Sequence, residues 1–278
     1  MSDEAPTSAL EHFGPRLPTG FKAGGRELRD FTLRPLRGRF RRELLNAATA
    51  GTLSEAKVTL RSAVADLGGL GPPGSVEVDR MPMADLQYVY LSCAQLQGHT
   101  YEVPFQCTCG YEWKQAVQPG QVGFIPASGE TSFTKEGDPC MQVTFLDPAE
   151  RRDITMVVRL QTVADIVALQ AVASKRATKN SEGAFGDAIF DQLVRTVVDY
   201  DGTGKGLTHE MLDDMDVSTL DALNFAASKV APAQPDTDIE TNCPKCRAVV
   251  HEDLEVSAWL VPFAPRVDST SSSPTPSS

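Results

Sequence analysis

The sequence predicts an α+β fold that is mostly helical, with short antiparallel strands and a zinc ribbon split between two distant parts of the chain. Three observations lead to this prediction. Apolar residues recur at helical spacing in several separate segments. The middle of the chain instead alternates between apolar and polar residues, as half-buried strands do. Four of the six cysteines form two close pairs that lie far apart in the sequence.

The first hundred residues indicate one strand followed by three helices. Residues 17–20 are expected to form a break in the chain where the fold begins. Residues 27–36 predict a short strand. Helices are expected over about 38–50, 54–66 and 82–96. A Gly/Pro-rich stretch at 68–74 predicts a loop before the third helix.

The middle of the chain carries the strand signal. Residues 101–105 alternate and run into the first cysteine pair, and a return strand starts at Tyr111. A loop rich in Gly, Ser, Thr and Pro is expected over 125–139. Alternation at 141–145 and again at 154–158 predicts a hairpin with a longer connection.

The following segment returns to helical spacing. Helices are expected over 162–173, 185–197 and 216–229. The last has a capping-box-like start at Ser218 and Asp221, and Pro232 lies just beyond its end.

These elements define the expected domain organisation. Residues 1–15 and the Ser/Thr/Pro-rich residues 264–278 are predicted to be disordered tails, because the latter cannot bury a core. Residues 16–263 form a single helical α+β domain. Within it, segments 101–118 and 239–252 build the ribbon.

The predicted zinc ligands are Cys107, Cys109, Cys243 and Cys246. Structural zinc takes four tetrahedral ligands, commonly thiolates that come in pairs from two tight turns. Gly110 lets the first turn adopt a positive φ behind the metal. Six scattered cysteines are too few for a secreted disulfide scaffold. The 133 residues between the two pairs are then a large insertion carried on the ribbon.

Other interpretations of the cysteines stay open. The two pairs could be unrelated reduced thiols, or Cys243 and Cys246 could form a redox pair. His99 or His251 could replace a cysteine as a metal ligand. The two remaining cysteines are predicted core residues: Cys93 and Cys140.

A second metal motif lies at residues 199–210. Its candidate calcium ligands, at positions 1, 3, 5 and 12 of an EF-hand loop, are Asp199, Asp201, Thr203 and Glu210. Against calcium, Gly206 stands at position 8, where an apolar residue normally bridges to a partner hand, and no second hand is visible. A plain connection between helices is the alternative.

No catalytic motif is present in the sequence, so we expect no enzyme and no small-molecule substrate. The chain has no Gly-x-Ser-x-Gly, no His-Glu-x-x-His and no dinucleotide fingerprint. A zinc ion held by four thiolates has no open position for a reacting water.

Charge and hydropathy restrict the partners and the compartment. The net charge of −11 disfavours nucleic acid, because cations on phosphates dominate that affinity. Residues 16–42 are an exception, with nine Lys/Arg against two Asp/Glu. No apolar run approaches the roughly 18 residues of a membrane span. The N-terminus lacks the basic start and apolar core of a secretory signal, so we expect the cytoplasm of the producing cell.

Five features occur in a characteristic order. They are Arg-Pro-Leu at 34–36, Met-x-x-x-Asp-Leu at 81–86, Cys-x-Cys-Gly at 107–110, Cys-Pro-x-Cys at 243–246 and an apolar helix over 254–263. This order resembles the zinc-ribbon-containing baseplate hub and tail-assembly proteins of T-even-type contractile phages and of related phage-tail-like injection systems.

The resemblance covers residues 17–263. It implies a structural or assembly protein of a tail baseplate, which contacts other tail subunits in the host or producer-cell cytoplasm and either stays in the assembled virion or tail particle or leaves after assembly. Only the four cysteines carry over as site residues. The sequence departs at Arg247, where the family usually has Gly. The alternative is a zinc-ribbon nucleic-acid-binding or transcription-associated protein that uses the basic residues 16–42.

Overall fold

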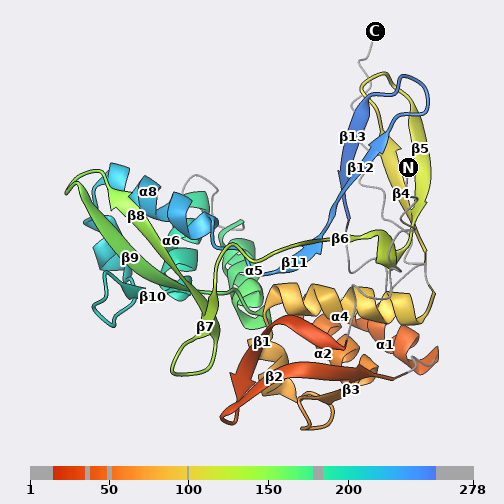
Figure 1. The fold of residues 1–278 in the computed structure, drawn as a ribbon, viewed down its shortest axis with the longest axis horizontal. Coiled ribbons are helices and arrows are strands. Elements are labelled where there is room, and N and C mark those ends of the chain that lie inside the picture. Colours follow the sequence, from red (N-terminus) through yellow and green to blue (C-terminus); the bar gives the residue numbers. More distant parts are fainter. Residues whose placement is uncertain (1–14, 35–37, 49–51, 99, 178–183, 255–278) are drawn as a thin grey trace, which may run out of the picture.

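The computed structural model describes residues 15–34, 38–48, 52–98, 100–177 and 184–254. The apolar helix predicted after Cys246 and nearly all of the two predicted tails lie outside these residues. Figure 1 shows three parts: an N-terminal body, a second lobe, and a narrow arm that projects from the body. Among the described residues, no helix is both long enough and apolar enough to cross a membrane.

The N-terminal body packs a small antiparallel sheet against helices. Its elements are β1 (Arg16–Ala23), β2 (Arg26–Leu33), α1 (Gly38–Ala48), α2 (Thr52–Ala63), β3 (Val64–Leu67), α3 (Ser75–Arg80) and α4 (Met83–Leu96). The sheet has the order β1-β2-β3. Because β1 is an edge strand, it tolerates Pro18, which has no N–H to donate. Gly20 has a φ of 72° where the pairing of β1 with β2 shifts register.

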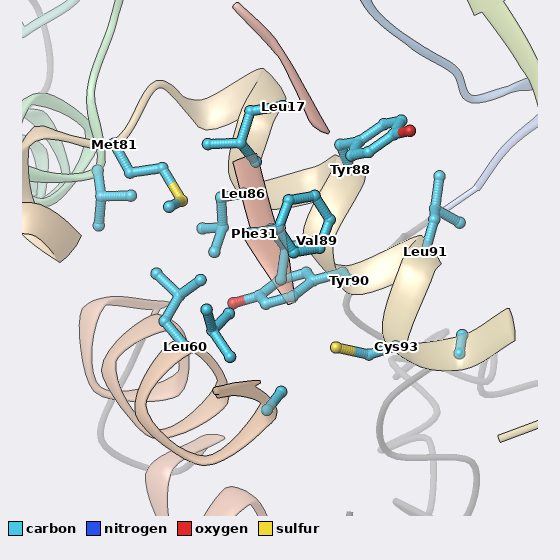
Figure 2. Close-up of a cluster of buried hydrophobic side chains, with 14 of the residues drawn as sticks. Leu17, Phe31, Leu60, Met81, Leu86, Tyr88, Val89, Tyr90, Leu91 and Cys93 are labelled. Atoms are coloured by element: carbon cyan, nitrogen blue, oxygen red, sulfur yellow. The ribbon is translucent and has the colours of Figure 1, made fainter. Parts of the chain in front are cut away.

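Helix α4 is the centre of the body. Ten of its 14 residues are buried, so it is enclosed by the core rather than lying on the surface. Figure 2 shows Leu86 and Val89 of this helix among Leu17, Phe31 and Leu60, which come from β1, β2 and α2. Burying one such side chain contributes about 1.5–3 kcal/mol. The two predicted helices that precede α4, which are α1 and α2, therefore contribute to the core around it.

A buried carboxylate joins α4 to β1. The backbone N–H groups of Thr19 and Gly20 donate to Oδ1 and Oδ2 of Asp85, at 2.9 and 2.8 Å. Burial raises the pKa of Asp85 to about 7, although these hydrogen bonds and the charge of Arg29 act in the opposite direction. Arg29 is itself fixed, because its guanidinium donates to the carbonyl oxygens of Pro18 and Thr19.

The second lobe packs helices on a four-stranded antiparallel sheet of order β10-β9-β8-β7. Its elements are β7 (Thr131–Phe133), β8 (Pro139–Asp147), β9 (Arg152–Arg159), α5 (Val163–Ala177), α6 (Ala184–Thr196), β10 (Val197–Tyr200), α7 (His209–Asp213) and α8 (Val217–Ser228). Met156, Leu193 and Leu223 belong to its separate buried cluster. Helix α5 contacts α2 and α3 of the body as well as α6 of the lobe, so it joins the two parts.

Two hairpins form the arm (Figure 1). They are β4 (Tyr101–Gln106) with β5 (Glu112–Val117), and β12 (Asp238–Asn242) with β13 (Val249–Asp253). Thr241 Oγ1 donates to Gln115 Oε1 at 2.8 Å and so links the hairpins. The chain leaves the first hairpin through the 3-10 helix η2 (Pro119–Gln121) and β6 (Gly123–Ile125) and returns to the second through β11 (Gln234–Asp236). Strands β6 and β11 pair with each other where the chain crosses between arm and lobe.

The prediction of a mostly helical fold is wrong. The protein is about 34% helix and 36% strand, arranged in several antiparallel sheets. Strand β1 was not predicted, because Pro18 and Gly20 are typical of loops. Strand β10 begins at Val197, which we expected to end a helix, and β7 lies inside the loop predicted over 125–139. The predicted hairpins are present, as the pairing of β4 with β5 and of β8 with β9 shows.

Replacing Asp85 tests the link between α4 and β1. In Asp85→Asn an amide NH₂ faces one of the two donating N–H groups, which should lower the free energy of unfolding by about 1–3 kcal/mol at pH 5. The folded-state pKa of Asp85 lies above the usual unfolded value near 4, so its proton stabilises the fold below that value, and this stability is lost as the pH rises to 7. The difference in free energy of unfolding between wild type and Asp85→Asn should therefore be smaller at pH 8 than at pH 5, as measured by urea titration.

Asp66→Asn is the matched control. The Asp66 carboxylate also accepts two backbone hydrogen bonds, from Gly69 and Gly71, but in an exposed turn. Asp66→Asn should lower the free energy of unfolding by less than Asp85→Asn does, because water can replace the lost hydrogen bonds in an exposed turn. If the difference in free energy of unfolding between wild type and Asp85→Asn stays constant or grows with pH, the buried Asp85 does not stabilise the fold through its raised pKa.

Candidate metal centre

The four predicted ligands meet at the turns of the two arm hairpins. The Sγ atoms of Cys107, Cys109, Cys243 and Cys246 all lie within 4.8 Å of one another. In the part of the chain that the structure describes, no other three or more His, Cys, Asp or Glu side chains gather in this way. Positions 109 and 243 are 134 apart in the sequence, so folding brings the two pairs together. The cluster could hold a metal ion.

The first pair of cysteines is shaped by the turn from β4 to β5. The N–H of Cys107 donates to the carbonyl of Tyr111 at 2.9 Å, and the N–H of Gly110 donates to the carbonyl of Cys107 at 2.9 Å. Gly110 has a φ of 78°, so the sequence prediction of a left-handed glycine here is confirmed. The tight turn places Cys107 in a buried position and Cys109 in an exposed one.

The second turn repeats this design with one more residue. The N–H of Cys243 donates to the carbonyl of Ala248 at 2.8 Å, and the N–H of Arg247 donates to the carbonyl of Cys243 at 2.9 Å. Arg247 therefore stands where Gly110 stands in the first turn, and its φ is 63°. A non-glycine residue in this conformation costs roughly 1–2 kcal/mol, so the second turn is strained where the first is not.

The sulfur positions fit a tetrahedral centre. Two Sγ–Sγ distances are 3.5 Å, between Cys107 and Cys246, and 3.8 Å, between Cys109 and Cys243. Ligands about 2.3 Å from a tetrahedral zinc lie about 3.8 Å apart. A disulfide would require a separation of about 2.05 Å. The distances thus suit four ligands around one ion better than two disulfides.

The thiols also differ in how readily they lose a proton. The backbone N–H of Cys109 lowers the pKa of Cys107 to about 6 by hydrogen bonding to its sulfur, and contacts with the other cysteines add to this effect. The thiolate is the form that binds metal. The surroundings of Cys107 therefore favour its thiolate form.

Aromatic packing supports the first hairpin below the cysteines. The rings of Phe105 and Trp113 stack with centroids 5.2 Å apart, and the ring of Tyr111 lies 6.0 Å from that of Trp113. Phe105 is buried in the same cluster that fills the N-terminal body. The body's core therefore continues into the base of the arm and holds the first turn in place.

The remaining candidates for this site lie elsewhere. His251 lies on β13 with its Nδ1 3.1 Å from a carboxylate oxygen of Asp238, and it is not part of the cysteine cluster. His99 falls outside the described residues. Cys93 and Cys140 are both buried, which confirms the prediction that they are core residues.

Among the described residues, the acidic members of the predicted calcium site (Asp199, Asp201 and Glu210) do not gather into a group that could hold a metal ion. Asp199 lies on strand β10, and its Oδ1 accepts a hydrogen bond from the N–H of Gly204 at 2.9 Å. Asp201 Oδ2 lies 2.7 Å from Nη1 of Arg152. Thr203 Oγ1 donates to the carbonyl of Tyr200, and Glu210 belongs to helix α7. The helix that an EF-hand requires before the loop ends at Thr196 and gives way to a strand.

Several cations of the basic segment 16–42 are engaged inside the protein. The guanidinium of Arg29 binds backbone carbonyls of β1, and Nη2 of Arg34 donates to the carbonyl of Val64 at 2.6 Å. Nζ of Lys22 lies 4.6 Å from the ring centroid of Phe133. These side chains stabilise the body, which leaves fewer cations for a phosphate backbone.

No family model, no curated protein and no solved structure matches the chain. The likeness to tail proteins therefore depends on the sequence motifs alone. Sequence reasoning found the four cysteines because metal ligands have a recognisable spacing. It did not find the buried role of Asp85, because its two partners lie more than 60 positions away.

Matched substitutions in the two turns test their design. Gly110→Ala should lower the local opening free energy of the arm by about 1–2 kcal/mol, because alanine must adopt the left-handed conformation although there is room for its Cβ. Arg247→Gly should raise it by up to about 1 kcal/mol, since strain is relieved while the unfolded chain gains freedom. Amide hydrogen exchange in β4, β5, β12 and β13 measures both.

Gly129→Ala provides the control. Gly129 also has open space around its Cβ position but no positive φ, so alanine should leave hydrogen exchange in the arm unchanged. An equal effect at Gly129 and Gly110, or a loss of protection in Arg247→Gly, would show that the turn conformation is not what limits the arm.

Proposed function

We propose that the four cysteines bind one zinc ion whose role is structural. The observation that carries this proposal is the closed, four-sulfur donor set at two hairpin turns. Four protein thiolates fill a tetrahedral zinc, whereas catalytic zinc keeps an open position for water. Soft thiolates select zinc, copper(I) or iron, and tetrahedral sulfur is typical of zinc or iron–sulfur proteins. The pairing of one tight turn with another favours zinc.

We further propose that the chain is an assembly or structural protein of a contractile tail baseplate or a related injection system. The order of sequence motifs supports this role. The motif residues have structural partners: Asp85 holds β1, while Met81 and Leu86 are buried. In this proposal the protein acts through its surfaces, by contacts with other tail subunits and without catalysis.

The nucleic-acid alternative has less support. It depends on the basic residues 16–42, and Arg29 and Arg34 of this segment bind the protein's own carbonyls. The charge of the segments around the cysteines is also unfavourable for binding nucleic acid. The segments 101–117 and 238–253 hold six Asp/Glu against three Lys/Arg. Phosphate binding requires the reverse balance.

Metal analysis tests the zinc proposal. We expect about one zinc per chain by mass spectrometry of protein purified without added metal. Cys243→Ser should lose most of it, because a hydroxyl replaces a thiolate ligand. Cys140→Ala, a buried cysteine outside the cluster, should retain it. The proposal would be overturned by a wild-type chain that contains no metal and whose arm amides are still protected from hydrogen exchange.

Removal of the gene from a producing phage or injection system tests the assembly role. Electron micrographs should show particles without complete baseplates, and the wild-type gene should restore them. Normal particles from the deletion strain contradict the role. A DNA titration of the purified chain at two salt concentrations discriminates the alternative. Binding with a steep salt slope that is lost in Arg39→Ala/Arg42→Ala would favour nucleic acid.

A further inference from the structure

A cavity of about 400 Å³ lies where the N-terminal body meets the second lobe. Met83 and Gln87 of α4 line it from the body. The end of β9 and helices α6 and α8 line it from the lobe, and Gln234 of β11 contributes from the crossing strand. Its volume is within the range of about 300–1,000 Å³ for ligand pockets, which often form at such junctions. None of the arm cysteines lines it, so it is separate from the metal centre.

The polar lining of this cavity consists largely of carboxamides. They are Gln87, Gln161, Gln192, Asn224 and Gln234. Each side chain offers one oxygen acceptor and two N–H donors. Within the described part of the chain, none of the five amides has a hydrogen-bond partner in the protein. Their donors and acceptors are thus available to a ligand, and they converge from both sides of the junction.

The described residues that line the cavity carry no uncompensated charge. Arg159 is the one charged residue among the described residues that line it. Its guanidinium donates to both carboxylate oxygens of Asp165, at 2.7 and 2.9 Å, and to the carbonyl of Arg195 at 3.1 Å. A phosphate or carboxylate ligand would therefore find no free cation here, and a cationic ligand would find no free anion.

Other ligand classes fit the lining poorly. The described lining residues include no Asp, Glu, His or Cys, so the donors that metals prefer are missing. They include no aromatic ring either, and nucleobases rely on such rings for stacking. What is present is a set of neutral hydrogen-bonding groups beside apolar side chains such as Leu160 and Val230.

We propose that this cavity binds an uncharged, extended peptide segment of a partner protein. Peptide groups present one N–H and one C=O per residue, and carboxamides pair with both. The apolar lining residues would contact the side chains of the peptide. This contact is of the kind that an assembly protein uses, but the inference does not depend on the tail role or on zinc.

A peptide array tests this proposal. The purified full chain is applied to short random-sequence peptides with blocked ends, and its binding to each peptide is compared with that of the variant Gln87→Leu/Gln192→Leu. These side chains make no hydrogen bonds within the protein, so the replacement should change folding stability by no more than about 0.5 kcal/mol. Loss of hydrogen bonds to the peptide should weaken binding by about tenfold.

Gln142→Leu is the matched control. Gln142 is exposed on β8 and does not line the cavity, so this variant should bind the same peptides with unchanged affinity. The inference is overturned if no peptide binds the wild-type chain, or if the control variant loses as much affinity as the double variant. Because the readout involves no metal, it can fail while the zinc measurement succeeds, and the reverse.

Discussion

The arm of this protein depends on the meeting of two hairpin turns whose cysteines, at 107 and 246, are 139 positions apart. Closing a loop of about 100 residues costs roughly 4.7 kcal/mol in the chain-entropy model of disulfides. Structural zinc contributes about 10–16 kcal/mol in small finger peptides, which exceeds that cost. Four thiolates this close to one another repel each other unless a cation lies between them. A bound dication thus converts a repulsive cluster into the closure of the arm.

The rest of the molecule is held by other interactions. The body has its own buried cluster around α4, and the lobe has a second cluster between its sheet and α6 and α8. The lobe is an insertion between the two arm hairpins, and the antiparallel pair β6–β11 carries the chain out and back. Loss of the metal should therefore loosen the arm first and leave the lobe's cluster intact, because that cluster contains no residue of the arm. The proposed metal centre would fix the position of the arm and leave the surfaces of body and lobe for contacts.

The sequence was most informative where a pattern is local. The spacing of the four cysteines predicted their meeting, and periodicity placed α4 and the hairpins β4–β5 and β8–β9. Strand β1 was not predicted because Pro18 and Gly20 are typical of loops. An edge strand with a shift in its pairing register can nevertheless contain both. The calcium motif matched in spacing, but Asp201 is drawn to Arg152 instead. The five carboxamides of the cavity share no local pattern, so only the fold could reveal them.

X-ray absorption at the zinc edge of the purified full chain tests the central claim most directly, because it reports the ligands of the ion. We predict a single zinc environment with four sulfur ligands at about 2.3 Å and no nitrogen or oxygen in the first coordination sphere. A spectrum that requires nitrogen or oxygen ligands, or fewer than four sulfurs, would contradict a metal centre built from Cys107, Cys109, Cys243 and Cys246.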